Sequence, residues 1–285
     1  MVIRRRSAPI QLPALLLLSF LFSSSSAVAL VRRDLVSREV VQERLERVTR
    51  GNKMRRDALE SMFLEAGCRD ENLTRQPVPQ SMLPNVLCTL PGQTDRVIIL
   101  AAHFDMRGPG LGVIDNWTST SLLPSVFQSL AQNPRRHTFV FIGFSDEERG
   151  LIGAKHYVQM MSKADRARLA AMVNMDGVGI LAPRVWASRA DPMLLKRLKE
   201  VASQTGIALA EFNLDGVGMM DSFPFDDRRL PSISLHSLAP GNWSIPHSQH
   251  DQMDAADPRH LYDSYRLVVA YLLSLDAESP ASAGR

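Results

Sequence analysis

The chain has 285 residues, of which 45% are hydrophobic and 22% are charged, and its formal net charge is +3. This length and hydrophobic content suit one large α/β domain and exclude a chain that is disordered throughout. Three of the 33 basic residues and none of the 30 acidic ones lie in residues 1–29, so the remainder carries 30 of each. A balanced charge of this kind gives no indication of nucleic-acid binding.

The first 29 residues have the pattern of a secretory signal peptide. A basic segment, Arg4–Arg6, precedes an apolar run of 11 residues, Leu12–Phe22, and the segment ends in the cleavage motif Ala27–Ala29. The apolar run is short for a bilayer, although an uncleaved membrane anchor is the alternative. We therefore expect a secreted or periplasmic protein without stable membrane association after cleavage. A catalytic domain is expected over residues 30–275, followed by a disordered tail over residues 276–285.

The remaining elements are predicted in chain order from periodicity and turn residues. Two amphipathic helices are predicted within residues 31–67, and residues 69–83 are predicted to be mostly loop. Apolar runs predict strands at residues 86–90, 97–102, 137–144, 169–175 and 232–235, with a further short strand at 184–187. Helices are expected at residues 116–131, 151–161, 191–204 and 257–275. This alternation predicts a single α/β domain with a mainly parallel, twisted sheet and helices on both faces.

The chain contains two cysteines, Cys68 and Cys88. Their spacing is not that of a metal knuckle, and two cysteines are too few for a disulfide scaffold. In an oxidising compartment they could pair, so we expect a disulfide after export, with two buried free thiols as the alternative.

Side chains that bear chemistry follow four of the predicted core strands. They are His103 and Asp105 with Asp115, then Glu147 and Glu148, then Asp176, and finally His247, His250 and Asp251. Each group has an ordinary interpretation, such as a helix cap at Asp115. Together, however, histidines and carboxylates converging at one sheet edge would be costly as unpaired buried charge, and a divalent cation removes that cost. The mixture of imidazole and carboxylate without thiolate predicts zinc or a similar ion.

The sequence resembles the zinc exopeptidases with two co-catalytic metal ions, which include leucyl aminopeptidases, glutamate carboxypeptidases and glutaminyl cyclases. The resemblance covers about residues 35–275. Its motifs occur in the family's order: H-x-D at residues 103–105, G-x-x-D-N at 112–116, E-E-x-G-L-x-G at 147–153, N-x-D at 174–176, and H-[ST]-x-x-D-x-x-D-x-x-D-P at 247–258. The last motif makes His247, and not His250, the expected ligand.

The resemblance implies a role for each matching residue. Five side chains would hold two zinc ions: Asp115 as the bridge, His103 and Asp176 at one ion, and Glu148 and His247 at the other. Asp105 would orient the His103 imidazole. Glu147 would be the general base that takes a proton from the attacking water and passes it to the leaving amine.

Two expected substrate contacts depart from the family pattern. The segment Met220–Phe225 resembles the family's S-D-H-x-x-F, with Met220 in place of serine and Ser222 in place of histidine. Asp221 is still expected to line the substrate site. An aromatic residue often precedes the last histidine in the family, whereas here Pro246 does, and Trp243 lies slightly upstream.

The leading interpretation is a secreted aminopeptidase that acts on peptides with a free α-amine. A carboxypeptidase or dipeptidase is an alternative, because Arg107 or Arg149 could clamp a substrate carboxylate. A glutaminyl cyclase is a second alternative, but the tryptophans expected after the glutamate pair and before the last histidine are missing. A non-catalytic relative is disfavoured because the five ligands and the base are all retained. The sequence makes no prediction about oligomeric state.

Overall fold

The computed structural model describes residues 35–277, which form a single α/β domain. The expected signal peptide and nearly all of the expected tail lie outside these residues. Asp276 had been assigned to the tail, but it is the last residue of the final helix and is buried. Its carboxylate accepts hydrogen bonds from the backbone amides of Arg136 and His137, which explains why the helix extends this far. None of the described helices is long and apolar enough to cross a bilayer.

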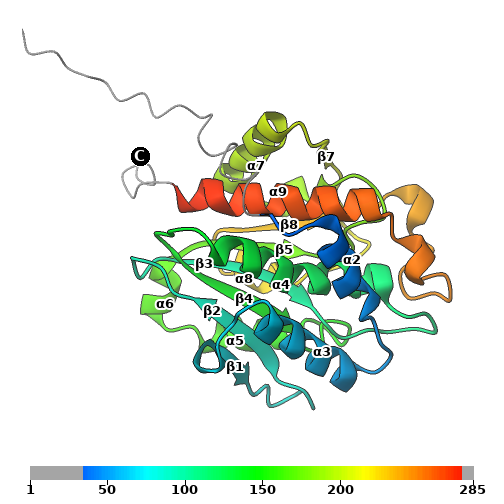
Figure 1. Ribbon diagram of the computed structural model, residues 1–285, viewed down its shortest axis with the longest axis horizontal. Coiled ribbons are helices and arrows are strands. Elements are labelled where there is room, and N and C mark those ends of the chain that lie inside the picture. The colour runs from blue at the N-terminus through cyan, green and yellow to red at the C-terminus, as the bar shows by residue number, and fades with distance from the viewer. Residues whose placement is uncertain (1–34, 278–285) are drawn as a thin grey trace, which may run out of the picture.

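The domain is built on one mixed sheet of eight strands in the order β1-β2-β4-β3-β5-β8-β6-β7 (Figure 1). The strands are β1 (Leu73–Gln76), β2 (Asn85–Leu90), β3 (Val97–His103), β4 (Thr138–Phe144), β5 (Leu169–Met175), β6 (Arg184–Val185), β7 (Ala210–Glu211) and β8 (Ser232–His236). The four central strands, β4, β3, β5 and β8, are mutually parallel. Strand β2 pairs antiparallel to β1 and β4, and β6 pairs antiparallel to β8. The predicted fold class is therefore confirmed.

The expected loop over residues 69–83 is wrong in part, because it contains β1 and the short 3-10 helix Asp70–Asn72. Strand β1 lies at the edge of the sheet and carries the polar sequence LTRQ, two residues of which are exposed. It has no apolar alternation that a sequence pattern could detect. Its register is set by pairing with β2, with Leu73 opposite Cys88.

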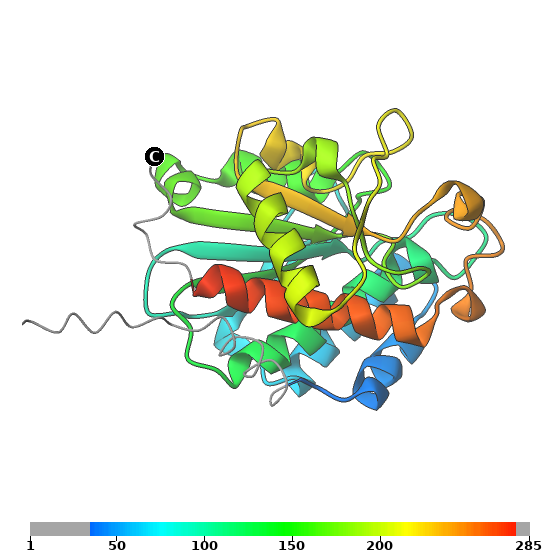
Figure 2. The same cartoon turned by 90° about the horizontal axis from the view of Figure 1, so that it is seen from above.

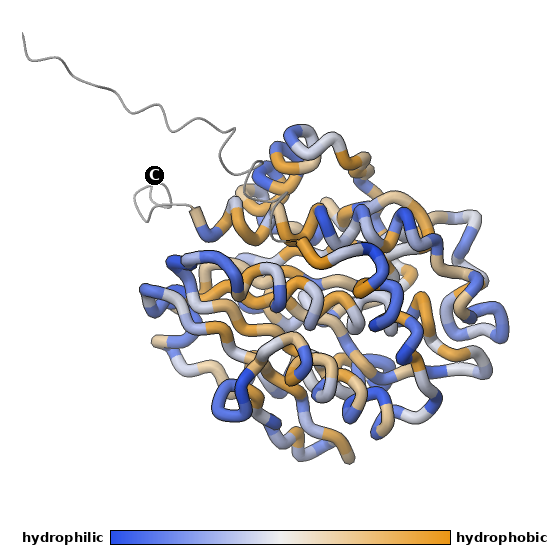
Figure 3. Tube along the Cα trace, viewed as in Figure 1, coloured by the Kyte–Doolittle hydropathy of each residue, from blue (hydrophilic) through white to orange (hydrophobic). Residues whose placement is uncertain are grey.

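Helices cover both faces of the sheet. They are α2 (Arg38–Glu46), α3 (Asn52–Glu65), α4 (Thr118–Ala131), α5 (Ile152–Met160), α6 (Lys163–Arg168), α7 (Pro192–Thr205), α8 (Phe223–Asp226) and α9 (Pro258–Asp276). Alternate residues of β3 point to opposite faces: Ile98 and Leu100 pack with α3, α4 and α9, whereas Ile99 packs with α5 and α8. Figure 2 shows α7 and α9 crossing one face, and Figure 3 shows the hydrophobic segments concentrated in the strands and inner helices.

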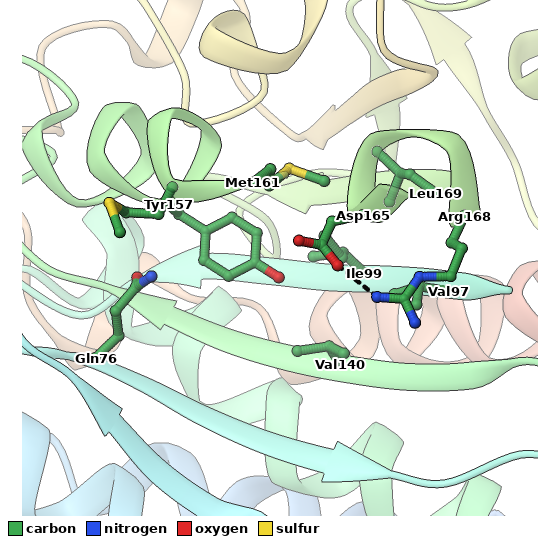
Figure 4. A pocket seen from close by; sticks show the side chains of 10 residues that line it. Gln76, Val97, Ile99, Val140, Tyr157, Met161, Asp165, Arg168 and Leu169 are labelled. Carbon is green, nitrogen blue, oxygen red and sulfur yellow. Dashed lines mark hydrogen bonds and ion pairs between the residues drawn. The ribbon is translucent and has the colours of Figure 1, made fainter. Parts of the chain in front are cut away.

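The face covered by α5 and α6 contains a cavity. Its volume is about 290 Å³, and it lies between α5, α6 and strands β3 and β4 (Figure 4). Tyr157 and Met161 line its helical side and Val140 its sheet side, and Asp165 forms an ion pair with Arg168 at its rim. The cavity lies near the amino ends of β3 and β5, opposite the edge where the predicted site residues gather.

Cys68 and Cys88 form a disulfide, as expected. Cys68 follows α3 and Cys88 lies in β2, and both side chains are buried. The bond therefore joins the end of a covering helix to the antiparallel side of the sheet.

Candidate metal centre

The predicted ligands come from the carboxyl ends of neighbouring parallel strands. His103 is the last residue of β3, Glu147 and Glu148 follow β4, and Asp176 follows β5. Because these strands run parallel, their ends meet at one edge of the sheet. Asp115 lies in the turn Val113–Trp117 after β3, where its own backbone dihedral angles are not helical.

The first cluster consists of His103, Asp115 and Asp176. The Nε2 atom of His103 lies 3.2 Å from Oδ1 of Asp115 and 3.7 Å from Oδ1 of Asp176. His103 is 1% exposed, and Asp176 is also buried. The three ligand atoms are therefore close enough to share one cation.

The second cluster consists of Asp115, Glu148 and His247. The Nε2 atom of His247 lies 2.9 Å from Oδ2 of Asp115 and 2.8 Å from Oε2 of Glu148. The two clusters thus use different oxygens of the same Asp115 carboxylate. An arrangement of this kind can bridge two ions.

Two properties of the site indicate that it can bind cations: buried ligand atoms without hydrogen-bond partners, and carboxylates that favour positive charge. Within the described chain, Nε2 of His103 and Oε1 of Glu148 are buried and accept or donate no hydrogen bond. Burial alone would lower the pKa of His103, but the surrounding carboxylates, led by Glu147, raise the pKa well above its ordinary value. Hydrogen bonds to Asp115 and Glu148 raise the pKa of His247 to about 10. A site that makes both histidines more basic favours positive charge at its centre, as a dication requires.

Asp105 contacts both His103 and the turn that carries the glutamate pair. The Nδ1 atom of His103 lies 3.1 Å from the backbone carbonyl oxygen of Asp105 and 3.5 Å from its carboxylate. The two carboxylate oxygens also accept hydrogen bonds from the backbone amides of Glu147 and Glu148, at 3.1 and 3.2 Å. Asp105 therefore connects the end of β3 to the turn that carries the glutamate pair.

Glu147 faces the open side of the metal centre and lines a cavity of about 430 Å³. Burial, opposed by His103 and reinforced by Asp176, raises the pKa of Glu147 well above its ordinary value. A carboxylate with raised basicity next to the ligands is suited to accept and return a proton.

The same cavity has an apolar wall formed by Trp186, Leu214, Met220, Leu238 and Trp243. Trp243 packs against Phe212, with ring centroids 6.1 Å apart. The wall can receive an apolar side chain.

Asp221 is buried beside this wall, next in the chain to Met220. Both carboxylate oxygens of Asp221 lack a hydrogen-bond partner within the described chain, and burial raises its pKa well above the ordinary value. Ser222, which stands where the family has histidine, instead shares a hydrogen bond of 2.6 Å with Ser234.

Two buried residues, Asp251 and Arg55, hold the loop of the bridging ligand Asp115 in place. The sequence analysis did not predict this supporting role for either residue. Asp251 accepts hydrogen bonds from the backbone amides of Ile114, at 2.6 Å, and Asp115, at 3.1 Å. Arg55, on α3, donates to the backbone carbonyls of Phe104 and Gly112, at 2.5 and 2.9 Å. The only sequence signal for Asp251 was its place in the last motif, and Arg55 had none.

The glycine-rich loop after β3 packs directly on the segment that carries His247. A Cβ atom on Gly108 would lie 2.6 Å from the carbonyl oxygen of His247, and one on Gly110 would lie 2.4 Å from that of Ser248. Larger residues at these positions would separate the two segments. The glycines therefore bring the last ligand to the others.

Comparison with known proteins gives a family match over most of the chain. Residues 85–272 match the profile of Peptidase family M28. The chain is 26% identical over 159 residues to leupeptin-inactivating enzyme 1 of Streptomyces exfoliatus. The aligned region covers 54% of this chain and 36% of that protein. The chain thus spans about a third of the length of this curated relative.

Solved structures share the fold. The LapA aminopeptidase of Legionella pneumophila superposes with a TM-score of 0.76 at 17% identity, covering 89% of this chain and 75% of that one. A glutaminyl cyclase from an Acidobacteriales bacterium superposes with a TM-score of 0.68 at 19% identity, covering 95% of this chain and 99% of that one. At these identities the likeness concerns the fold alone.

Proposed function

Because this chain belongs to Peptidase family M28, we propose that it is a secreted, zinc-dependent aminopeptidase that removes N-terminal residues from peptides. The observation that carries the proposal is the pair of three-ligand clusters that share Asp115, beside Glu147 and at the mouth of an apolar cavity. Secretion is supported by the pattern of residues 1–29 and by the disulfide between Cys68 and Cys88.

The donor set fits two zinc ions, with His103, Asp115 and Asp176 at one and Asp115, Glu148 and His247 at the other. When bound, zinc supplies Lewis-acid chemistry, which polarises a carbonyl and makes hydroxide available near neutral pH. Asp105 fixes the turn that presents Glu147 through its bonds to the two glutamate amides. Glu147 accepts a proton from the attacking water and donates it to the leaving nitrogen.

Charge favours a substrate with a free α-amine. The cavity wall carries four carboxylates, those of Asp115, Glu147, Glu148 and Asp176, and one arginine, Arg107. Asp105 and Asp221 are buried beside it. These six acidic groups exceed the five positive charges of two dications and Arg107, so the cavity attracts an ammonium group and repels a free carboxylate. The apolar wall would receive the first side chain of the peptide.

Two experiments test this function. One short peptide is offered in free, N-acetylated and C-amidated forms, and we expect acetylation to abolish cleavage, whereas the amidated peptide is still cleaved. Loss of cleavage on amidation alone would indicate a carboxypeptidase and refute the proposal. In the second experiment, Glu147→Gln keeps its zinc and loses a factor of ~100 to ~10,000 in rate. Glu71→Gln, at an exposed carboxylate, serves as the control and stays at the wild-type rate.

A glutaminyl cyclase is the second candidate, because the cyclase structure is matched over nearly the whole of both chains. Cyclisation would release ammonia from an N-terminal glutamine without cutting the chain. Mass spectrometry of a Gln-initiated peptide separates the candidates: cleavage supports the aminopeptidase, and loss of ammonia alone supports the cyclase.

A further inference from the structure

A second cavity of about 510 Å³ adjoins the catalytic cavity. Gly150 lines both cavities, so they meet directly after the Glu147–Glu148 pair. The proposed activity gives the second cavity no role.

The second cavity is a groove along one face of α5. Its helical wall consists of Ile152, Lys155, His156, Gln159 and Met160, which recur at helical spacing. The opposite wall is the segment Val78–Gln80, which is anchored by the buried side chain of Val78.

The amino end of α5 is fixed to the sheet by Asn85. The side chain of Asn85 donates to the carbonyl oxygen of Gly153 at 3.0 Å and accepts from the amide of Ser145 at 3.0 Å. A Cβ atom on Gly153 would lie 2.3 Å from the Asn85 oxygen, so the helix can approach only because this position is glycine. The groove is therefore built on a rigid wall.

The groove is cationic. Arg149, Lys155 and His156 line it, and no residue along its wall carries a carboxylate. Arg149 forms an ion pair with Asp146 at 2.8 Å, and its side chain remains 60% exposed. The side chains of Lys155 and His156 have no ion-pair or hydrogen-bond partner in residues 35–277. The charge of Lys155 is therefore available to a ligand.

The direction of the peptide follows from the chemistry of Glu147. The group that protonates the leaving nitrogen must lie on the side from which that nitrogen departs. Arg149 and Gly150 follow Glu147 closely in the chain and lead into the groove. We propose that the groove along α5 binds the part of the peptide that follows the scissile bond, and that it selects carboxylate groups there. This inference rests on the proposed peptidase function.

The dimensions of the groove suit a short extended segment. Helix α5 has 9 residues and is therefore about 13 Å long, which corresponds to about four residues of extended peptide. At its far end, Met160 also lines the cavity of Figure 4, where Tyr157 and Val140 offer an apolar surface. The carboxylates can come from acidic side chains or from the free terminus of a short peptide.

The test compares three amidated tetrapeptides, Leu-Ala-Glu-Glu, Leu-Ala-Gln-Gln and Leu-Ala-Lys-Lys. For the wild-type enzyme we expect kcat/KM for leucine release to be about three- to tenfold higher with Glu-Glu than with Lys-Lys, as suits exposed charges. Lys155→Glu removes or reverses this ratio, whereas Lys196→Glu, on α7, leaves it unchanged. Raising the ionic strength to 0.5 M weakens the ratio, because the charges are exposed. A pair of tripeptides, Leu-Ala-Gln as free acid and as amide, shows whether a terminal carboxylate is also recognised.

Leucine anilide, which does not reach the groove, provides the reference. Its hydrolysis should be the same in the wild type and in Lys155→Glu. Equal ratios in these two proteins, or a wild-type preference for Lys-Lys, would overturn the inference while leaving the peptidase intact. Failure to release leucine from every substrate, the anilide included, would contradict the proposed function and this inference with it.

Discussion

Replacing Arg55 with methionine should destabilise the loops that carry Asp105 and Asp115 without leaving a large cavity. The side chain is fully buried on α3, and its guanidinium lies 5.0 Å from the ring centroid of Trp117. Burial lowers the pKa of Arg55 to about 10, opposed by carboxylates led by Asp105, so it remains protonated at neutral pH. Methionine can keep the apolar contact with Trp117 but donates no hydrogen bond.

The magnitude follows from the groups that Arg55 leaves behind. Its guanidinium donates to the carbonyl oxygens of Phe104, Leu111 and Gly112 at 2.5, 2.9 and 2.9 Å. Each buried acceptor that loses its donor costs about 1–3 kcal/mol, less what local relaxation recovers. Removing one partner from a buried charged network typically costs about 3–5 kcal/mol. We therefore expect the free energy of unfolding to fall by about 3–5 kcal/mol.

The assay is urea unfolding in EDTA, which separates the effect from metal binding, together with kcat/KM of the zinc-loaded enzyme. A small displacement of the Asp105 and Asp115 loops should lower kcat/KM by about 100-fold. Lys53→Met, on the same helix at a side chain that is 75% exposed, is the control and should change neither quantity. If Arg55→Met stayed within about 1 kcal/mol of the wild type and kept its activity, the assigned role of these hydrogen bonds would be wrong.

Burial lowers the pKa of His236 from 6.5 to about 4, so the unfolded chain binds the proton more readily between these values. The contribution of neutral His236 to the free energy of unfolding is fully present above pH 6.5. It is lost as the pH falls towards 4, which lowers the free energy of unfolding by about 3 kcal/mol. Urea unfolding of the His236→Gln variant should lack this pH-dependent contribution. Replacing Cys68 and Cys88 with serine should lower the free energy of unfolding by about 3 kcal/mol under non-reducing conditions. Asp251→Asn should reduce zinc affinity and activity by about 10- to 100-fold, measured by metal titration and kinetics, because the carboxylate fixes the Asp115 backbone.

Each of these expectations has a result that contradicts it. For His236, the contrary result is that the difference in free energy of unfolding between the wild type and the His236→Gln variant is the same at pH 7.5 and pH 4.5. The hydrogen bonds of its ring explain the expected loss: Nε2 lies 2.9 Å from the carbonyl oxygen of Phe212, and Nδ1 accepts from the amide of Leu238 at 3.1 Å. A second ring proton would face that amide. For the cysteines, the contrary result is that the wild-type protein has the same free energy of unfolding with and without reductant. For Asp251, it is unchanged zinc affinity in the asparagine variant.

The buried strands and the residues at their ends could be predicted from local sequence. Strands β3, β4 and β5 are mostly apolar because both faces are covered, and such runs are visible without tertiary information. Parallel strands place their carboxyl ends at one edge, so His103, Glu148 and Asp176 could be expected to converge. The family resemblance then made Asp115 the expected bridge and His247, rather than His250, the expected last ligand.

Strand β1 and the residues that support the metal ligands, Arg55 and Asp251, could not be predicted in the same way. The strand has no apolar period, since it is an edge strand whose pairing alone defines it. Arg55 lies 49 positions from the carbonyl group of Phe104, and Asp251 lies 137 positions from the amide of Ile114. No local pattern reports contacts across such separations, because they exist only once the chain has crossed the sheet.

The sequence by itself thus determined the α/β class, the sheet core and the set of candidate ligands, because burial and motif spacing are local properties of the chain. Only the tertiary structure decided which oxygen atoms of Asp115 face each histidine, where the Asp105 carboxylate points, and that a cationic groove follows α5 away from Glu147. These features depend on distances between elements remote in the sequence. Packing of the whole domain sets those distances.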